Sequence, residues 1–462
     1  MSTQTNTGCQ PLLKQAAENL DAVDFKKLSV LRLLRHRENT WLGVTEPTLC
    51  NANTKRLQEI NPGAAEMASF KTADQLILQE ADYAHSQHLL GDTQATGQLQ
   101  LPKIVQYDLF HITEALPQQR DFAAASSGYS FFFRENAKAE ILAHLRRYHE
   151  LGVIPCLLWH TYHPRWGNQT FEEITAQEAD AFGAGPATEV ADLLLLAHHI
   201  HVPESAWNNR YDPRQQHLLR SLQQKLDRIA NFANELAKNE IVCLFRPYHE
   251  ANGHWFWWSI QHFNADRQVA GAQFAALWRN TRRYLEEVRG VRNLLWVWSP
   301  NVVGEWVDNP QRVQTDYLFP LAPADADVLG LDFYANNINL SAQDGRSKRA
   351  VRMSAAFEML AAIRRAFPDK PVGFTELGMR HHLDLNNGQR VASPQGGDIW
   401  LDTDLQQHFM SSDTHPHFTI FWRNEPGAME QVVAGQGIGM DRSFRWLWAN
   451  LSTRLTDVTP VV

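Results

Sequence analysis

The chain has 462 residues, of which 44% are hydrophobic and 20% are charged, an ordinary composition for a folded globular protein. Its formal net charge is −8 and its Lys and Arg residues are spread along the chain, which argues against a nucleic-acid partner. The longest apolar runs are too short for a membrane span, and the first residues lack the basic and apolar regions of a signal peptide. We therefore expect no membrane partner and no leader in this chain.

Short β-type runs alternate with amphipathic helical segments along the chain, which is the pattern of βα units. Eight runs are predicted to be strands: residues 40–44, 103–107, 153–159, 241–245, 294–298, 328–333, 371–374 and 418–421. Four segments carry apolar residues at spacings of three and four and are predicted to be helices: residues 134–150, 215–238, 267–288 and 351–367.

Polar residues of catalytic type stand at the ends of these predicted strands, among them Asp108, His160 and Glu376. In a (β/α)8 barrel the C-terminal strand ends open at one mouth, where the site is built. A doubly wound sheet would bring a glycine-rich phosphate turn, and the sequence has no G-x-G-x-x-G. We predict an α/β fold, a TIM barrel formed by residues 101–450 as one catalytic domain. Residues 1–100 are predicted to be an N-terminal extension that includes the first barrel strand, with loop insertions at residues 165–212 and 379–404.

The most informative motif is the run F-R-P-Y-H-E-A-N-G-H-W-F-W-W-S at residues 245–259. It places Glu250 among aromatic residues, whose faces suit sugar rings, and a carboxyl group there can act as a general acid. The alternative interpretation is a buried ion pair of Arg246 with Glu250 beside an aromatic packing cluster. A second acid, Glu376, ends the predicted seventh strand in K-P-V-G-F-T-E-L-G. Two carboxylates that face each other across a sugar-binding mouth are what glycoside hydrolysis requires.

These residues resemble glycoside hydrolase family 26, the β-mannanase family, whose signature usually reads R-P-x-H-E-x-N-G-x-W-F-W-W. Further segments resemble the family in the family's order: L-D-R-I-A, N-L-L-W-V-W-S-P-N, D-V-L-G-L-D-F-Y, P-V-G-F-T-E-L-G and F-W-R-N. The resemblance covers residues 103–424, whereas the first hundred and the last thirty-five residues match poorly. Where the family usually has glycine after W-F-W-W, this sequence has Ser259.

The resemblance implies that Glu250 is the general acid/base and Glu376 the nucleophile of a retaining enzyme, with the two carboxyls about 5–5.5 Å apart. It also implies that several other residues bind the sugar: His160 and His249 in the −1 subsite, Trp255 as its aromatic wall, Asp332 within the site, Tyr334 against the nucleophile, and Trp422 with Arg423 towards the non-reducing side. Glu305 is kept as an alternative nucleophile.

The expected function is endo-acting hydrolysis of β-1,4-mannosidic linkages in mannan, glucomannan or galactomannan, by double displacement. One alternative is a relative that acts on mixed-linkage β-1,3-1,4-glucan or β-1,3-xylan, since the family includes both. An alternative of another class is a non-catalytic glycan-binding barrel, although such decay would usually replace one of the two acids. The family resemblance suggests secretion, but no signal peptide is recognised in this sequence. The location is therefore left open. We expect a monomer whose partner is a β-linked polysaccharide or oligosaccharide.

No cofactor and no metal are expected. The histidine groups lack the spacing of metal ligands on a helix, and the four cysteines have no metal-type spacing either. Cys156 and Cys243 lie in apolar runs and are predicted to be inert core thiols. Whether Cys9 and Cys50 form a disulfide is left open.

Overall fold

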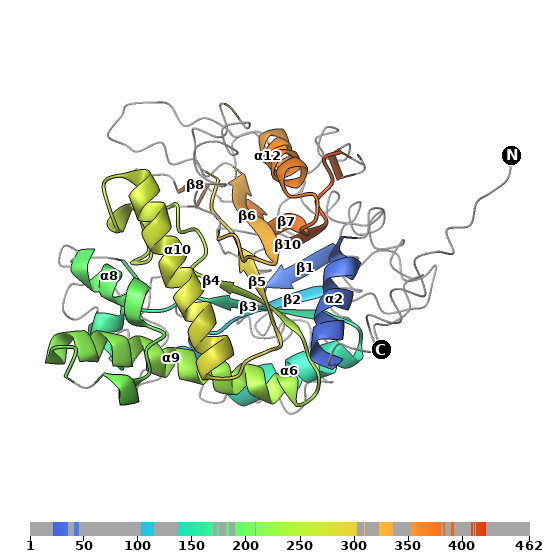
Figure 1. Cartoon of the computed structure of the whole chain (residues 1–462). Helices are drawn as coiled ribbons and strands as arrows, with labels where there is room; N and C mark the ends of the chain where they lie inside the picture. The colour runs from blue at the N-terminus through green and yellow to red at the C-terminus, as the bar shows by residue number, and fades with distance from the viewer. Residues whose placement is uncertain are drawn as a thin grey trace, which may run out of the picture.

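In the computed structural model, eight parallel strands close into a barrel, and helices pack around its outside (Figure 1). The structure describes residues 22–35, 41–45, 103–114, 137–169, 190–207, 209–302, 323–335, 353–379 and 413–421, together with short pieces at 173–174, 182–183, 309, 382–383, 390–391, 408–409 and 411. No helix within these ranges is long and apolar enough to cross a membrane.

The barrel strands follow the predicted runs closely. They are β1 (Trp41–Thr45), β2 (Ile104–Asp108), β3 (Ile154–Trp159), β4 (Cys243–Pro247), β5 (Leu294–Trp298), β6 (Val328–Ala335), β7 (Val372–Met379) and β10 (Phe418–Phe421). Their order around the barrel is β1-β10-β7-β6-β5-β4-β3-β2, and β1 closes the ring by pairing with both β10 and β2. The predicted (β/α)8 barrel is therefore confirmed.

Most of the larger helices also lie where the periodicity placed them. The structure contains α2 (Ala22–Leu34), α5 (Phe110–Thr113), α6 (Ala137–Glu150), α8 (Val190–His199), α9 (Pro213–Ala237), α10 (Arg267–Arg283) and α12 (Met353–Ala366). The predicted helix at 267–288 continues from α10 into a π-helical turn, Tyr284–Val288. Short 3-10 turns lie at Pro164–Trp166, Glu204–Ala206 and Ile260–His262.

Local capping explains where α9 begins. The side chain of Asp212 accepts a hydrogen bond from the backbone N–H of Gln215, and the Gln215 side chain accepts one from the backbone N–H of Asp212. Pro213 occupies the first turn, where its missing N–H has no partner to lose. The apolar face of α9 is buried along most of its length, so this helix is anchored both at its start and by packing.

The N-terminal half of the barrel interior is apolar. Alternate strand residues face inward there, as the two-residue period of a strand requires. The interior cluster comprises Ile104, Ile154, Cys156, Val242, Leu244, Leu295, Val297, Val328, Phe418 and Ile420, joined by Val30 and Leu34 of α2. Helix α2 therefore covers this end of the barrel, a role that the sequence analysis did not predict.

The structure also contains elements that were not predicted, and one prediction stays open. The two-residue strands β8 (His382–Leu383) and β9 (Arg390–Val391) pair antiparallel inside the predicted insertion at 379–404. Helix α8 lies inside the predicted insertion at 165–212. The division of the chain at residue 100 stays a prediction, because most of residues 1–100 lie outside the described residues.

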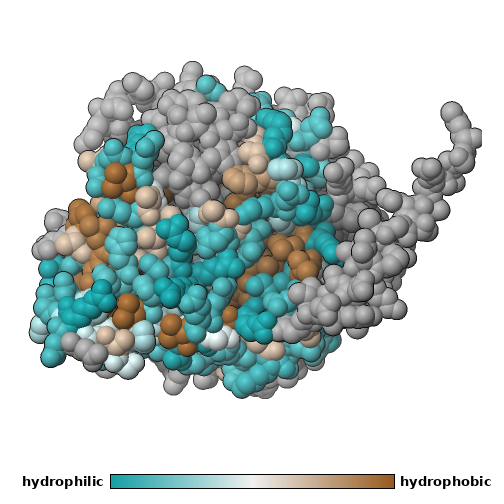
Figure 2. Space-filling view, in the orientation of Figure 1, coloured by the Kyte–Doolittle hydropathy of each residue, from teal (hydrophilic) through white to brown (hydrophobic). Residues whose placement is uncertain are grey.

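Most of the tryptophans that the structure describes are packed in the interior. The largest side chains with almost no exposed surface include Trp159, Trp257, Trp278, Trp296 and Trp298. Trp278 packs edge-on against Trp296 and Trp298 between α10 and β5. On the face in Figure 2, hydrophobic residues lie in small patches among hydrophilic ones, as on an ordinary protein surface.

Gly373 in β7 has no room for a side chain. A Cβ placed there would lie 2.2 Å from the carbonyl oxygen of Phe418 in the neighbouring strand β10. We expect Gly373→Ala to lower the free energy of unfolding by about 3 kcal/mol, because relief would require a strand of the closed barrel to move. Urea unfolding followed by circular dichroism measures this loss.

Gly290→Ala is a useful comparison, because a Cβ there meets no atom within 4 Å and only the positive φ of +68° is unfavourable. Gly290→Ala should lower the free energy of unfolding by only about 1–2 kcal/mol. A loss at Gly373 no greater than that at Gly290 would contradict the close packing of β7 on β10.

Candidate active site

Arg246 lies inside the barrel near the C-terminal end of β4. Leu244 belongs to the interior cluster, so the two-residue alternation of the strand turns Arg246 inward as well. Its Nη1 atom donates to both carboxylate oxygens of Asp332, at 2.7 and 2.8 Å, and its Nη2 atom donates to Oε1 of Glu376. Burial alone would lower the pKa of Arg246. The two carboxylates more than offset this effect, so the net pKa is raised and the guanidinium stays charged.

Asp332 and Glu376 stand side by side on β6 and β7. The register pairs them directly, immediately after an irregularity between Leu331 and Asp332. The hydroxyl of Thr375 donates to Oδ1 of Asp332 at 2.6 Å. Burial raises the pKa of Asp332 well above its ordinary value; Arg246 opposes this shift and the carboxyls of Glu376 and Glu250 add to it. This strand pair therefore carries two acids that share one guanidinium.

Glu250 lies in the turn that follows β4. Its φ is +51°, a left-handed conformation that is unfavourable for a residue with a side chain. Its backbone N–H donates to the carbonyl of Ser299 at 2.8 Å, and its own carbonyl accepts from Gly253 at 2.8 Å. These bonds hold the strained residue so that its side chain enters the mouth of the barrel.

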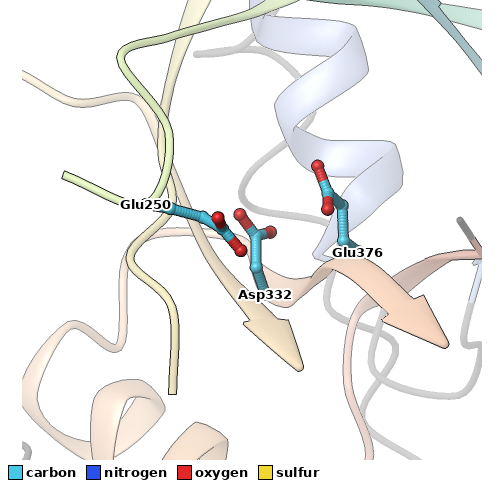
Figure 3. A group of neighbouring side chains, drawn as sticks. All are labelled: Glu250, Asp332 and Glu376. Carbon is cyan, nitrogen blue, oxygen red and sulfur yellow. The ribbon is translucent and has the colours of Figure 1, made fainter. Parts of the chain in front are cut away.

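The three carboxyl groups converge. One oxygen each from Glu250, Asp332 and Glu376 lie within 4.8 Å of one another, and all three side chains are buried. Figure 3 shows Glu250 reaching from its turn towards Asp332, while Glu376 extends from the neighbouring strand. The separation is of the order found when one carboxyl attacks carbon and another donates a proton. Among the described residues this is the one set whose spacing suits a metal ion, and Arg246 already neutralises two of its members.

Both carboxylate oxygens of Glu250 accept a hydrogen bond. The indole Nε1 of Trp255 donates to Oε2 at 2.8 Å, and the side-chain amide of Asn301 donates to Oε1. A Cβ at Gly253 would lie 2.5 Å from the ring of Trp255, so only glycine lets this ring pack against the turn. Gly253 therefore makes room for the indole.

Two buried histidines flank the acids. Nδ1 of His160 lies 2.5 Å from Oδ2 of Asp108, and the backbone N–H of His160 donates to Oδ1 of the same carboxylate. The rings of His160 and His249 meet edge to face with centroids 4.3 Å apart. Burial lowers the pKa of His249 well below its ordinary value, and His160 and Arg246 add to the effect. His249 is therefore neutral at physiological pH.

The three tryptophans of the motif have different environments. Trp255 is 37% exposed, whereas Trp257 and Trp258 are fully buried. The indole of Trp257 donates to the carbonyl of Thr161 at 3.1 Å, and that of Trp258 donates to the carbonyl of His249 at 2.8 Å. Trp255 is thus the tryptophan of the motif that can offer a face to a ligand, and the other two fix the surrounding loops.

The structure brings together six of the predicted site residues: Glu250, Glu376, His160, His249, Trp255 and Asp332. The backbone of Tyr334 belongs to β6, but its side chain lies outside the described residues. Trp422, Arg423 and Glu305 also lie outside them, as do Cys9 and Cys50. The roles assigned to these residues stay predictions.

Three contacts were missed by the sequence analysis. Arg246 was considered only as a partner of Glu250, yet it donates to Glu376. Asn301 donates to Glu250 from the segment N-L-L-W-V-W-S-P-N, and Asp108 contacts His160. The strand-end position of Asn301 and Asp108 was the available signal, because strand ends of a barrel meet at one mouth.

Comparison with known proteins agrees with this geometry. Residues 204–388, which include both Glu250 and Glu376, match the model of glycosyl hydrolase family 26. Over these residues, which make up less than half of the chain, the sequence is similar to glycosyl hydrolase family 26. The matched region contains β4 to β7 and therefore the whole cluster of carboxyls.

Curated relatives match over about a third of the chain. "Mannan endo-1,4-beta-mannosidase" of Bacillus subtilis is 34% identical over 133 residues, which are 29% of this chain and 34% of the relative. "Mannan endo-1,4-beta-mannosidase A and B" of Caldalkalibacillus mannanilyticus is 30% identical over 153 residues, 33% of this chain and 25% of the relative. The alignments therefore span between a quarter and about a third of these relatives.

Solved structures share the fold over most of the chain. The endo-β-1,4-mannanase double mutant of Cellulomonas fimi has a TM-score of 0.54 at 20% identity, covering 91% of this chain and 73% of that one. The catalytic domain of the family 26 endo-β-1,4-mannanase of Bacillus sp. JAMB-750 has a TM-score of 0.50 at 21% identity, covering 79% and 78%. At this identity the likeness supports the barrel fold.

We expect Arg246→Met to lower the free energy of unfolding by about 3–5 kcal/mol at neutral pH, because it leaves two buried carboxyls without their cation. The folded-state pKa of Asp332 lies above its unfolded value, so its protonation favours the folded state and the contribution fades as pH rises. Losing Arg246 raises that pKa further. The variant should therefore lose less stability at pH 5 than at pH 8, as urea unfolding at both values will measure.

Arg283→Met is the matched control, because it removes an exposed pair with Glu287. It should change stability by less than about 1 kcal/mol at either pH. An equally small loss for Arg246→Met would show that the buried cluster does not need its cation.

Proposed function

We propose that the chain is an endo-acting β-1,4-mannanase that cleaves mannan, glucomannan or galactomannan with retention of anomeric configuration. The observation that carries this proposal is the approach of Glu250 and Glu376 to within 4.8 Å at one end of the barrel, beside the exposed ring of Trp255. The substrate class is supported by the relatives named as mannan endo-1,4-beta-mannosidases.

In the first step, a carboxylate oxygen of Glu376 forms a bond to the anomeric carbon while the bond from that carbon to the glycosidic oxygen breaks. Glu250 gives its proton to the departing oxygen, so the leaving sugar departs as a neutral alcohol. Arg246 holds the carboxylate of Glu376 by a buried hydrogen bond, which fixes the direction of attack. The product of this step is a glycosyl-enzyme ester and an ionised Glu250.

In the second step, Glu250 takes a proton from water as the water oxygen attacks the anomeric carbon. The ester bond to Glu376 breaks and its carboxylate is restored. Trp255 and Asn301 both donate to Glu250, so the ionised form that exists between the steps has two hydrogen bonds ready for it. Two inversions at one carbon give net retention.

The environment of the histidines suits a neutral sugar. His249 is held neutral by burial. Its ring can therefore donate a hydrogen bond to one hydroxyl group and accept one from another. The contact between His160 and Asp108 fixes the orientation of the His160 ring. Trp255 offers an aromatic face at the same mouth, which suits the apolar face of a pyranose.

The alternative substrates would use the same residues. Mixed-linkage β-1,3-1,4-glucan or β-1,3-xylan requires the same pair of acids, and we favour mannan because of the names of the relatives. A glycan-binding barrel without activity is disfavoured by the presence of both acids in attacking range. The expectation of a monomer that binds no nucleic acid stays a prediction.

A panel of mannan, glucomannan, galactomannan, barley β-glucan and β-1,3-xylan tests the proposal, with product lengths read by chromatography. We expect a ladder of oligosaccharides from the mannose-containing polymers at early times. Glu376→Ala is the matched control and should reduce turnover roughly 10³-fold or more while the protein stays folded. Activity only on β-glucan or xylan would make that polymer the substrate in place of mannan. The absence of product from every polymer would refute the enzyme assignment.

Glu250→Ala should affect substrates according to their leaving groups. Cleavage of mannan needs protonation of a poor leaving group and should nearly stop. An aryl β-mannoside with an acidic phenol needs no such help, so a burst of phenol equal to the enzyme concentration should precede a slow phase. Stopped-flow absorbance measures both phases, and equal impairment on the two substrates would assign Glu250 a structural role.

The anomer formed first reports the mechanism. With the two carboxyls this close, we expect direct attack by Glu376 and therefore release of the β-anomer from a β-linked substrate. Proton NMR in the first minutes of hydrolysis should show the β-anomer first, followed by the α-anomer through mutarotation. An initial α-anomer would require water in place of the covalent intermediate and would overturn the roles of both acids.

A further inference from the structure

We propose that Asn301 is a positioning residue for Glu250, and that Asn252 holds Asn301 in place for this task. The inference rests on the proposed function, in which Glu250 is the acid and base. It goes further by assigning the control of that residue's orientation and proton affinity to a pair of asparagines from two different loops.

The side chain of Asn301 makes a direct contact with the acid. Its Nδ2 atom donates a short hydrogen bond to Oε1 of Glu250, while Trp255 donates to Oε2. Each carboxylate oxygen therefore has its own donor, one from the turn after β4 and one from the loop after β5. Two donors in fixed positions define the plane of the carboxyl group.

The backbone of Asn301 is held on two sides. The side chain of Asn252 accepts from the backbone N–H of Asn301 at 2.8 Å and donates to its carbonyl at 2.7 Å. Asn301 also forms an isolated parallel bridge with Asp332. In this bridge the N–H of Val302 donates to the Asp332 carbonyl at 3.0 Å. Asn301 therefore connects the turn of Glu250 to the strand of Asp332, and its side chain has little freedom to move away.

The chemistry of the donor sets the direction of its effect. The Nδ2 atom of an amide can donate and cannot accept, so its bond to Glu250 favours the ionised carboxylate. The charged and titratable groups around Glu250 come from several elements: Arg246 on β4, Asp332 on β6, Glu376 on β7, and His249 next to it in the chain. Because the nearby acids disfavour a third negative charge, Asn301 and Trp255 supply the local stabilisation of the ionised state.

This arrangement assigns Asn301 a larger role in the second step than in the first. Loss of the amide donor makes Glu250 hold its proton to higher pH, so it stays available as an acid while a smaller fraction is ionised to act as the base at a given pH. With an aryl β-mannoside, formation of the glycosyl-enzyme should change little in Asn301→Ala. Its hydrolysis should slow by up to roughly 10-fold, which appears as a larger burst than that of the native protein.

The experiment titrates Glu250 directly. The protein is labelled at the glutamate carboxyl carbons, and the signal of Glu250 is assigned by its loss in Glu250→Gln. We expect Asn301→Ala to move the titration midpoint upward by about 1 pH unit, the size of one hydrogen bond to a charged group. The alkaline limb of the kcat/KM profile should move by the same amount, a shift that a merely structural role would not produce.

Two further variants keep the test decisive. Asn301→Asp retains the shape of the side chain but replaces the donor by a charge, so it should move the midpoint further upward. Asn252→Ala should give a smaller shift in the same direction, because it releases Asn301 without removing it. Asn280→Ala is the matched control, since it loses a half-buried amide bond to the carbonyl of Ala197, and its midpoint should stay that of the native protein.

The outcomes separate this inference from the proposed function. An unchanged midpoint in both Asn301 variants would overturn the inference, even if the native protein degrades mannan. A shifted midpoint in a protein that cleaves no member of the polysaccharide panel would count against the proposed function and would still establish that Asn301 controls Glu250.

Discussion

The buried guanidinium of Arg246 is the constraint on which the rest of the site depends. It places one positive charge among three carboxyl groups and bonds directly to Asp332 and Glu376. Without it, neighbouring strands could not carry two acids at the same level of a closed barrel, because an unpaired charge in such a position is strongly unfavourable. With it, the cluster still has more acids than cations. Protonation of Glu250 is thus coupled to its neighbours, which suits the acid and base role that we propose for it.

Much of the fold followed from local patterns in the sequence. Each of the barrel strands corresponds to a short β-type run in the sequence. The strand ends carry the polar residues that a barrel gathers at one mouth. Glu250 and Glu376 could be predicted because both stand in motifs whose neighbours are equally informative. The structure adds that Glu376 lies within β7 rather than beyond its end, since the strand extends to Met379.

The contacts that the sequence could not reveal join residues from different strands. Whether Arg246 donates to Glu250 or to Glu376 depends on the alternation of β4 and on the pairing of β6 with β7, and neither can be read from one segment alone. The same holds for Asn301 and its clamp by Asn252. Composition alone could not assign roles to the tryptophans, because an abundance of large aromatic side chains is equally consistent with packing and with sugar binding.

The closure of the barrel by β1 has a consequence for synthesis of the protein. Trp41 pairs with Phe418, so the first strand of the ring meets its last partner only after the residues between them have been synthesised. At about 5–20 residues per second, that wait lasts roughly 20–75 s. During this interval the growing sheet has two open edges, which are the surfaces most prone to pairing with other chains. A barrel closed by its first and last strands therefore exposes these edges for longer than a small domain with local pairing would.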